Sequence, residues 1–313
     1  MSFPQVSILI PVFNRKNYIA QCIQSALDQS FADHEIVVVD NASDDGTWEI
    51  CQQFAALDPR VRVFRNEENI GPVRNWIRSA QEARGHYSKM LFSDDLLEPD
   101  CVARMLVPLE NPEVGLVSCA ARIGESKENS SVAYSVAGPA LIHRKKYLSR
   151  LLDNRAPVSP GAVLLRTDDL IRNLHTDFAT ATKRAFDKNG AGPDVMIMLL
   201  TALSYPRIAC LSEPLVFFRA HAGSFSIANA NNDVSMGYTS AIAYYLYRNE
   251  SWYLWLKYLV RLWISNIRSQ KKWINPIAFL KSNEGCGSIV EILVAGMMTS
   301  FLLVRMIARR AKR

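Results

Sequence analysis

The residues with the clearest chemical potential are the adjacent carboxylates Asp94 and Asp95, which follow a short apolar run in residues 90–100, MLFSDDLLEPD. Hard divalent cations such as Mg²⁺ and Mn²⁺ take oxygen ligands and are commonly held by one or two carboxylates together with substrate phosphates. Paired Asp at a strand end therefore predicts a cation site that could fix a nucleotide diphosphate. The same dipeptide also suits the turn after a strand, because Asp side chains bond to nearby backbone groups. Both interpretations stay open on these two residues alone.

Two more polar strand ends precede this pair. Residues 35–47, EIVVVDNASDDGT, place Asp40 after an apolar and β-branched run, and residues 6–15, VSILIPVFNR, place Asn14 after another. Continuous apolar runs of this length are typical of parallel strands buried on both faces. Ligands of open α/β sheets bind outside the carboxyl ends of the strands. We therefore expect Asn14, Asp40 and Asp94 on one rim, which outlines a nucleotide pocket.

The elements that would position these residues alternate between strand and helix. A further strand is expected at 61–65, and residues 69–71 lead into a helical pattern from about 72 to 83. This alternation predicts a doubly wound α/β fold. The first strand is followed by neither a G-x-G-x-x-G turn nor a Walker loop, the two common phosphate-binding motifs. A cation held by carboxylates is the alternative way to neutralise a diphosphate.

Six ordered motifs give the chain a resemblance to family 2 glycosyltransferases with the GT-A fold. They are VSILIPVFN, VVVDNASDDGT, NIGPVRNW, SDDLLEPD, GPDVMIMLL and LVFFRAHAGSFS, and they span roughly residues 5–226. The resemblance implies an α/β fold with a Rossmann-like, mostly parallel central sheet and helices on both faces, followed here by a C-terminal helical region. It also implies a nucleotide-sugar donor, most often a UDP-sugar, and hexosyl transfer to an acceptor hydroxyl with inversion, assisted by Mg²⁺ or Mn²⁺.

The resemblance assigns donor-binding roles position by position. Asp40 would accept a hydrogen bond from the base, and Asp94 and Asp95 correspond to the metal-binding acidic motif. Phe92 stands where the family often has the first Asp of D-x-D, which leaves open which Asp contacts the metal. NIGPVRNW also departs from the commoner family form, which carries Ala-Arg-Asn. The residues that would contact the donor nucleotide are Pro11, Val12, Asn14, Asp40, Arg74 and Asp94.

Inverting transfer needs a general base that takes the acceptor's proton while its hydroxyl attacks the anomeric carbon opposite the diphosphate. Asp194, just before a helical apolar run at 195–203, is the candidate. A carboxylate in a first helical turn also complements the helix macrodipole, which is the alternative interpretation. Arg219 and His221, past an expected strand at 215–218, could stabilise a leaving UDP. By the resemblance, His221 can also ligate the metal, although a lone His is more often structural.

Length and composition predict a catalytic domain at residues 1–226 and a basic, tryptophan-rich helical region at 227–313. The first residues lead directly into a strand and have neither a basic leader nor a long apolar core, so no secretory signal is expected. The cysteines show no C-x-x-C pair, which indicates reduced core residues rather than a disulfide or zinc framework. They are Cys22, Cys51, Cys101, Cys119, Cys210 and Cys286.

The C-terminal region carries the positive charge. From residue 227 onward, twelve Lys and Arg face four Asp and Glu, a net of +8, while the remainder carries −2 of the total +6. Trp and Leu recur at helical spacing over 252–263, with Lys257, Arg261 and Arg268 interleaved. Such a helix suits the headgroup region of an anionic membrane, or packs on the catalytic domain with a solvated basic face. The alternation of basic and large apolar residues is unlike a nucleic-acid-binding face.

Residues 289–304 are almost wholly apolar but short for a span, which needs about 20 residues. Shallow insertion, a true span and a soluble helix or oligomer contact stay open. The whole pattern predicts a cytoplasmic enzyme, peripheral on the inner face of the cell membrane. Its acceptor would be a saccharide or lipid-linked saccharide in surface polysaccharide or glycolipid synthesis.

Two rival functions remain at this point. A nucleotidyltransferase also joins a nucleotide-binding sheet to metal-binding Asp, but the loop PVFNRKNY lacks the glycines expected for holding a triphosphate. A catalytically degenerate, sugar-nucleotide-binding membrane protein is the other rival, and Phe92 in the acidic motif encourages it. Acceptor identity depends on residues 126–160 and 173–192, whose sequences do not indicate it.

Overall fold

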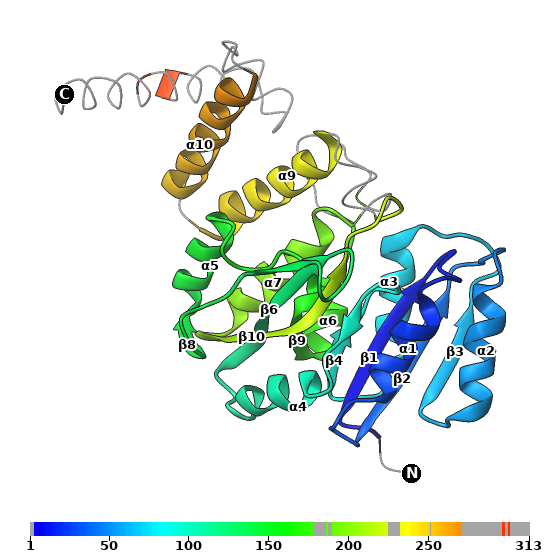
Figure 1. Cartoon of the computed structure of the whole chain (residues 1–313). Helices are drawn as coiled ribbons and strands as arrows, with labels where there is room; N and C mark the ends of the chain where they lie inside the picture. The colour runs from blue at the N-terminus through cyan, green and yellow to red at the C-terminus, as the bar shows by residue number, and fades with distance from the viewer. Residues whose placement is uncertain are drawn as a thin grey trace.

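The computed structural model describes residues 3–177, 186, 190–224, 232–250, 252–270, 296, 297 and 300. Its strands are β1 (Val6–Val12), β2 (His34–Asp40), β3 (Val61–Arg65), β4 (Tyr87–Met90), β5 (Leu96–Leu97), β6 (Val114–Gly124), β7 (Ser130–Ala133), β8 (Ala140–His143), β9 (Val163–Arg166) and β10 (Arg207–Arg219). Its helices are α1 (Ile19–Leu27), α2 (Thr47–Leu57), α3 (Pro72–Gln81), α4 (Cys101–Leu106), α5 (Arg144–Leu152), α6 (Thr167–Asn173), α7 (Pro193–Ser204), α9 (Asn232–Asn249) and α10 (Trp252–Gln270), with 3₁₀ turns η1 (Val107–Glu110) and η2 (Pro160–Ala162). Figure 1 labels most of them in chain order.

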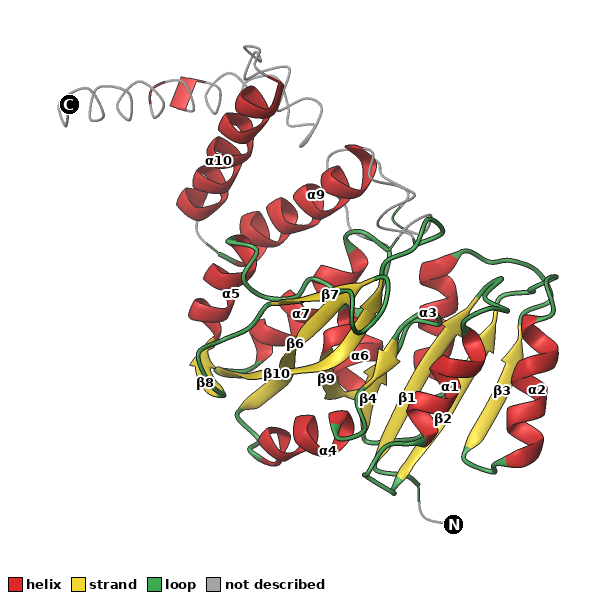
Figure 2. Cartoon of the chain, viewed as in Figure 1, coloured by secondary structure: helices red, strands yellow, loops and turns green. Residues whose placement is uncertain are grey.

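The strands form one sheet in the order β3-β2-β1-β4-β9-β6-β10-β5, with β7 paired to β6 and β8 to β10. From β3 to β4 all pairs are parallel. β9 runs antiparallel to both its neighbours, β4 and β6, and β6 then pairs in parallel with β10. Figure 2 shows these strands as one continuous layer. Because β1, β2 and β4 share a direction, their carboxyl ends meet at one edge.

Alternate residues of the central strands enter two apolar cores, one on each face of the sheet. Leu9 and Val37 pack with residues of α3, α5, α6 and α7, whereas Ile8 and Ile36 pack with residues of α1 and α4. This period of two is the geometry of a pleated strand covered on both sides. Helices on both faces of a largely parallel sheet were predicted from the alternating apolar segments.

The predicted strand and helix positions hold with small differences at their ends. β1 stops at Val12, just before Asn14, which takes a left-handed conformation with φ +50°. α3 ends at Gln81, two residues before the expected end. The expected strand at 215–218 is the last part of β10, which begins at Arg207. Five of the six cysteines are free and buried, as predicted, and Cys286 lies outside the described residues.

The basic, tryptophan-rich segment forms α10, and its apolar stripe is buried. Trp255, Leu259 and Trp263 are 6%, 0% and 0% exposed and belong to the same apolar cluster as α7. Arg261 Nη1 lies 2.6 Å from Asp153 Oδ1, just after α5. Figure 1 shows α9 over α5 and α7, with α10 following it. The sequence left two interpretations of this helix, contact with a membrane or packing on the catalytic domain. For these three apolar side chains, the contacts favour packing against protein.

Among the described residues, none of the helices has both the length and the apolar character that a membrane span requires. Residues 289–304 lie outside the described residues except for 296, 297 and 300, so the alternatives for that segment stay predictions.

Candidate active site

The loops after β1 and β2 are tied together at the predicted rim. The Asn14 amide nitrogen donates to Asp44 Oδ1 at 2.9 Å, and the Asp44 backbone N–H donates back to Asn14 Oδ1 at 3.1 Å. The backbone N–H of Asn14 also donates to Ser43 Oγ at 2.9 Å. Asn tolerates the left-handed conformation found here better than most residues. Asn14 therefore fixes one loop to the other.

Asp40 lies at the end of β2 with its side chain fully buried. Its Oδ2 accepts a hydrogen bond from the Ser43 backbone N–H at 3.1 Å and lies 3.3 Å from Arg65 Nε. Its Oδ1 is buried and has no hydrogen-bond partner among the described residues. An unsatisfied buried acceptor is costly. It is also what a site needs when the missing donor belongs to a ligand.

A network of asparagine amides frames the rim beside Asp40. The Asn66 amide donates to Asn41 Oδ1 at 2.7 Å and to Asn75 Oδ1 at 2.9 Å. The Asn75 amide donates to the Val39 carbonyl at 2.9 Å, and Asn41 donates to Asn69 Oδ1 at 2.8 Å. These bonds join the ends of β2 and β3 to the start of α3, so the rim is held by side chains as well as by the sheet.

Pro11 and Val12 lie within β1 and are buried. Val12 is 2% exposed and its side chain belongs to the core beneath α1, and its carbonyl accepts from the Asn41 N–H at 2.8 Å. Arg74 is exposed in the first turn of α3, next to the asparagine network. All the predicted nucleotide-contacting residues thus lie on or directly beside the same edge of the sheet.

The second half of the site joins the end of β4 to the end of β10. His221 Nε2 lies 3.0 Å from Asp94 Oδ2, although the two residues are 127 positions apart in the chain. Arg15 Nε lies 3.7 Å from the same Asp94 oxygen. Arg219 Nε donates to the Asp94 backbone carbonyl at 3.0 Å. The guanidinium carbon of Arg219 also lies over the ring of Tyr18, 5.1 Å from its centroid. The structure therefore brings Asp94, Arg219 and His221 together, as the motifs predicted.

Asp95 differs from Asp94 in its surroundings. Its Oδ1 accepts a hydrogen bond from the Arg219 backbone N–H at 2.9 Å, and only 8% of the residue is exposed. Burial, followed by the charge of Asp94, raises the pKa of Asp95 well above its usual range. Asp94 is the more accessible carboxylate, with 16% of its side chain exposed. This contrast favours Asp94 as the residue that meets a ligand and Asp95 as the one that holds β10 in place.

The donor set at Asp94 fits a hard cation that is shared with a substrate. Within the described part of the chain, no three His, Cys, Asp or Glu residues gather as a closed metal cage. Asp94 and His221 supply one oxygen and one nitrogen within reach of a common point. Mg²⁺ and Mn²⁺ sites commonly use one or two protein ligands, with waters and phosphates completing the shell. These two residues would hold such an ion.

Asp194 lies in the first turn of α7, which starts with Pro193 after Gly192 at φ +124°. Its Oδ1 accepts from the backbone N–H groups of Gly192 at 2.9 Å and Val195 at 2.7 Å. This bonding places the carboxylate at the start of α7, where it complements the helix macrodipole, as the alternative interpretation expects. Its Oδ2 accepts from Tyr238 Oη at 2.6 Å. Burial raises the pKa of Asp194 to about 7, which is the range of a general base at neutral pH.

Aromatic contacts connect the segment before α7 to the end of β4. The rings of Trp76, from α3, and Phe92 lie 5.2 Å apart. Trp76 also covers Gly190, where an added methyl group would come within 1.9 Å of the indole ring. Phe92, which replaces the first carboxylate of the usual acidic motif, thus takes part in packing between α3 and the loop that leads to Asp194.

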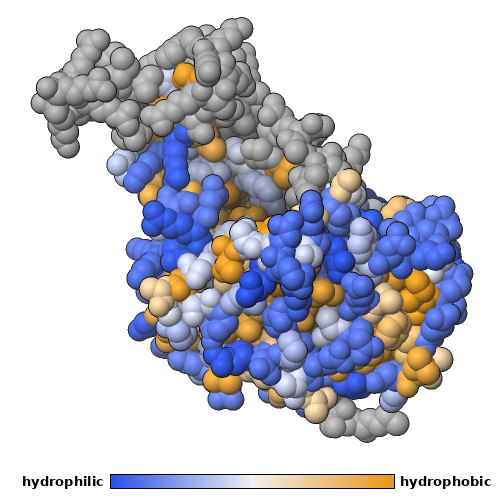
Figure 3. Space-filling view, in the orientation of Figure 1, coloured by the Kyte–Doolittle hydropathy of each residue, from blue (hydrophilic) through white to orange (hydrophobic). Residues whose placement is uncertain are grey.

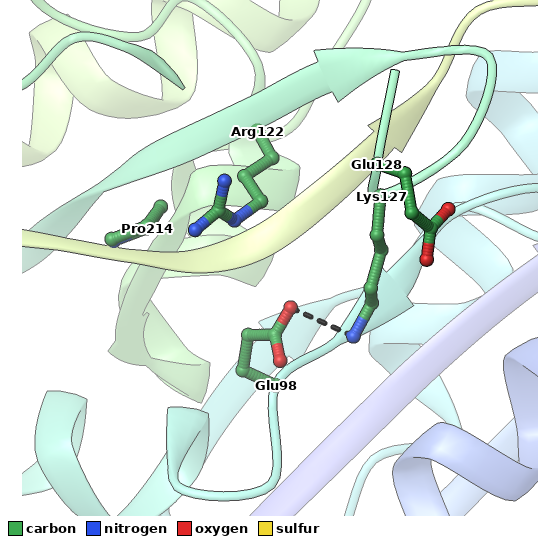
Figure 4. Close-up of a pocket in the computed structure, with 5 residues that line it drawn as sticks. All are labelled: Glu98, Arg122, Lys127, Glu128 and Pro214. Atoms are coloured by element: carbon green, nitrogen blue, oxygen red, sulfur yellow. Dashed lines mark ion pairs between the residues drawn. The ribbon is translucent and has the colours of Figure 1, made fainter. Parts of the chain in front are cut away.

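An open pocket is lined by residues outside the set of predicted site residues. Its volume is about 470 Å³, and Figure 4 shows Arg122 of β6 and Pro214 of β10 facing Lys127 and Glu128 of the following hairpin. Lys127 Nζ lies 2.8 Å from Glu98 Oε1. The residues that line this cavity include none of the predicted site residues, but Lys127 and Glu128 belong to the segment 126–160, which was predicted to determine the acceptor.

Sequence analysis missed three residues that the structure brings to the site. Arg15 contacts Asp94, Tyr18 stacks on His221 with ring centroids 4.6 Å apart, and Tyr238 contacts Asp194. The loop PVFNRKNY contained a signal for Arg15, because it places two basic residues just after a strand. Tyr238 gave none, because it lies 44 positions from Asp194.

Comparison with known proteins matches residues 7–173 to the model of glycosyl transferase family 2. Chondroitin synthase of Escherichia coli is 42% identical over 100 residues, which cover 32% of this chain and 14% of that protein. The match to two further curated glycosyltransferases likewise spans less than half of their length.

Solved structures share the fold. Staphylococcus aureus TarS 1-349 in complex with UDP-GlcNAc matches with a TM-score of 0.68 and 18% identity, covering 89% of this chain and 81% of that one. The mannosyltransferase PcManGT of Pyrobaculum calidifontis, in complex with GDP-Man and Mn²⁺, matches with a TM-score of 0.59 and 17% identity, covering 97% and 81%. These neighbours confirm the GT-A form of the α/β fold. The family match spans more than half of the chain, so the protein belongs to glycosyl transferase family 2 and is a glycosyltransferase.

Proposed function

We propose that the chain transfers a sugar from a UDP-sugar to an acceptor hydroxyl with inversion, in polysaccharide or glycolipid synthesis. The observation that carries the proposal is the meeting of Asp94, His221 and Arg219 at the strand edge beside the Asp40 rim. TarS binds UDP-GlcNAc on the same fold, and a chondroitin synthase matches at 42% identity over part of this chain. The TarS complex supports a nucleotide-sugar donor, and the chondroitin synthase supports a polysaccharide product.

The uracil base would be bound by Asp40. Its unpaired Oδ1 is suited to accept the ring N–H of uracil, and Asn14 and the asparagine network would hold the loops around the nucleoside. GDP is the donor nucleotide of PcManGT, so the choice between uracil and guanine is a specific part of this proposal. Cytosine has no ring N–H and would leave this buried acceptor unpaired, which is a strong source of discrimination against it.

The diphosphate would lie against Asp94, His221, Arg219 and Arg15. Asp94 and His221 would hold Mg²⁺ or Mn²⁺, and the chemistry that such an ion would supply is Lewis-acid stabilisation of the leaving phosphate. The two guanidiniums lie on the same side, within 3.0 Å and 3.7 Å of Asp94 atoms. Charge-assisted bonds from Arg to phosphate are strong and oriented. This side of the site is therefore suited to hold UDP as it departs.

Asp194 would act as the general base. It takes the proton of the acceptor hydroxyl as the new bond forms between that oxygen and the anomeric carbon, and the bond to the diphosphate breaks on the opposite face. A carboxyl whose pKa is about 7 accepts a proton efficiently at neutral pH. Loss of such a group commonly lowers the rate by about 10²- to 10⁴-fold.

We also propose that residues 227–313 form a membrane-associated part beside the catalytic domain, and that the corner between α9 and α10 faces the lipid. Tyr247, Trp252 and Tyr253 are 64%, 63% and 52% exposed there. Lys145 and Lys146 of the nearby α5 are exposed as well, and Figure 3 shows a hydrophilic surface over that helix. Exposed aromatic and basic side chains suit an anionic lipid surface, and a lipid-linked saccharide is then a sensible acceptor.

The first test is calorimetric titration of UDP, with GDP and CMP as controls, in the presence and absence of Mn²⁺. We expect UDP to bind selectively and with metal dependence, and Asp94→Asn to weaken it. Asp100→Asn, an exposed carboxylate in the same motif, is the matched control and should bind like the native chain. A preference for GDP would redirect the donor, and binding without release of UDP from any UDP-sugar would favour the degenerate protein.

Membrane association has its own test. The full chain should sediment with phosphatidylcholine vesicles that contain phosphatidylglycerol and stay in the supernatant with phosphatidylcholine alone. The double variant Trp252→Ala and Tyr253→Ala should lose sedimentation. Equal sedimentation of this variant and the native chain would exclude the α9–α10 corner as the lipid-facing surface.

A further inference from the structure

We propose that Tyr238 of α9 is a positioning residue for Asp194, so that the C-terminal helical region completes the active site. This inference rests on the proposed role of Asp194 as the general base. The family match ends at residue 173 and does not include α9. The inference therefore gives α9 a role in catalysis that the match does not indicate.

The contact between Tyr238 and Asp194 is short and sheltered. Tyr238 Oη donates to Asp194 Oδ2 at 2.6 Å, which is the length of a hydrogen bond to an ionised oxygen. Asp194 is 6% exposed. Its other oxygen is held by the backbone N–H groups of Gly192 and Val195. The three donors fix the plane of the carboxylate, and Tyr238 controls the oxygen that is not used for capping.

A glycine allows the two elements to come this close. Gly237 lies against Ala191, where an added methyl group would come within 2.4 Å of the Ala191 carbonyl oxygen. The reciprocal neighbour is Gly192, whose own added methyl group would lie 3.4 Å from the Gly237 carbonyl oxygen. The backbone of α9 thus touches the loop that begins α7, and Tyr238 is the next residue. The hydrogen bond follows from backbone contact rather than from a long, mobile side chain.

The groups that act most strongly on this pair are a second tyrosine and backbone amides. Tyr134, from the loop after β7, interacts with Tyr238, and hydrogen bonds from Tyr238 and the nearby backbone amides act on Asp194 against the effect of burial. Burial, and after it the charge of Asp194, raises the pKa of Tyr238 well above its usual range. The hydroxyl therefore keeps its proton at neutral pH and can donate it to the Asp194 carboxylate in a hydrogen bond.

The consequence for catalysis concerns the protonation of Asp194. Burial alone disfavours the carboxylate, and donation from Tyr238 opposes that effect by stabilising the charged form. Without the hydroxyl, the carboxyl would hold its proton to higher pH and would be a poorer acceptor at neutrality. Tyr238 thereby sets the pH range in which the proposed base is available.

The test is a ¹³C NMR titration of the full chain labelled at the aspartate carboxyl carbon. The resonance that disappears in Asp194→Asn identifies Asp194. In Tyr238→Phe its midpoint should rise by about one pH unit, which is the effect of losing one hydrogen bond to a charged group. Tyr247→Phe, an exposed tyrosine on the same helix, is the matched control and should leave the midpoint unchanged. An unchanged midpoint in Tyr238→Phe would overturn the inference.

Turnover separates this inference from the proposed function. Release of UDP from UDP-GlcNAc should be lost in Asp194→Asn while UDP binding persists. In Tyr238→Phe the loss should be about tenfold at pH 6 and small at pH 9, in line with the moved midpoint. Full activity of Asp194→Asn would reject the proposed role of Asp194 as the general base, but it would leave the NMR evidence for the contact between Tyr238 and Asp194 unchanged. An inactive Asp194→Asn with an unmoved titration in Tyr238→Phe would reject the positioning role alone.

Discussion

Replacing Asp194 by Asn should stabilise the protein at neutral and alkaline pH while removing turnover. Asn keeps the size of the side chain and an oxygen for the Gly192 and Val195 N–H groups. Its amide can donate to Tyr238 Oη, which lies 2.6 Å from Oδ2 in the native chain. What the substitution removes is a charge in a site that is 6% exposed. Active sites commonly carry such a cost in stability.

The magnitude follows from the difference between the pKa of Asp194 in the folded chain, about 7, and its ordinary value of 3.8. Between these values the folded state holds a proton that the unfolded state has lost. The free energy of unfolding of the native chain therefore falls as pH rises from about 4 to about 7, and it is level above that. At 1.36 kcal/mol per pKa unit the whole effect is roughly 4 kcal/mol, of which roughly 3 lies between pH 5 and pH 8.

Urea unfolding, followed by tryptophan fluorescence at pH 5 and pH 8, measures this effect. The free energy of unfolding of Asp194→Asn minus that of the native chain should be larger at pH 8 by about 3 kcal/mol. Asp100→Asn, at an exposed position, should show no such change with pH. A constant difference between Asp194→Asn and the native chain at the two pH values would refute the reasoning, because the offset from changed hydrogen bonds does not depend on pH.

Three other substitutions test packing and binding. Gly190→Ala places a methyl group within 1.9 Å of the Trp76 ring and should lower the free energy of unfolding by about 1–3 kcal/mol; an unchanged melting temperature would contradict that contact. Trp263→Ala, at a fully buried site, should cost about 3–5 kcal/mol, whereas Trp252→Ala, 63% exposed, should cost far less, and equal costs in chemical unfolding would show that α10 is not packed as described. Asp40→Asn should weaken UDP binding by about tenfold in calorimetry, as loss of a hydrogen bond to a charged acceptor predicts, and equal affinity would remove Asp40 from the base contact.

The first half of the fold could be predicted because its signals are local. β2 contains an apolar run that stops at Asp40, and β3 is a short β-branched and aromatic segment that ends at Arg65. Both ends are visible in the sequence. The antiparallel insertion of β9 between β4 and β6 could not be predicted. The four residues of β9, VLLR, carry no periodicity, and their place depends on pairing with strands more than 40 positions away.

The candidate site divides in the same way. Asp94 and His221 were predicted to lie together because each is part of an ordered motif, and they are 3.0 Å apart. Tyr238 was not predicted, since its contact depends on the approach of α9 to α7 through Gly237. The sequence correctly predicted that α10 is an amphipathic helix. It does not determine whether protein or lipid covers the apolar face of such a helix. Trp255 and Trp263 are covered within the chain.

The asparagine network has a consequence for how the site responds to salt. Asn41, Asn66 and Asn75 hold the rim through neutral amides, whereas the opposite half of the site depends on the charges of Asp94, Arg15 and Arg219. Dissolved ions screen interactions between charges over about 8–10 Å at moderate ionic strength and leave amide hydrogen bonds largely unaffected. Binding of the base should therefore persist in concentrated salt, while binding of the diphosphate weakens. The affinities of the protein for uridine and for UDP would then become more similar as ionic strength rises.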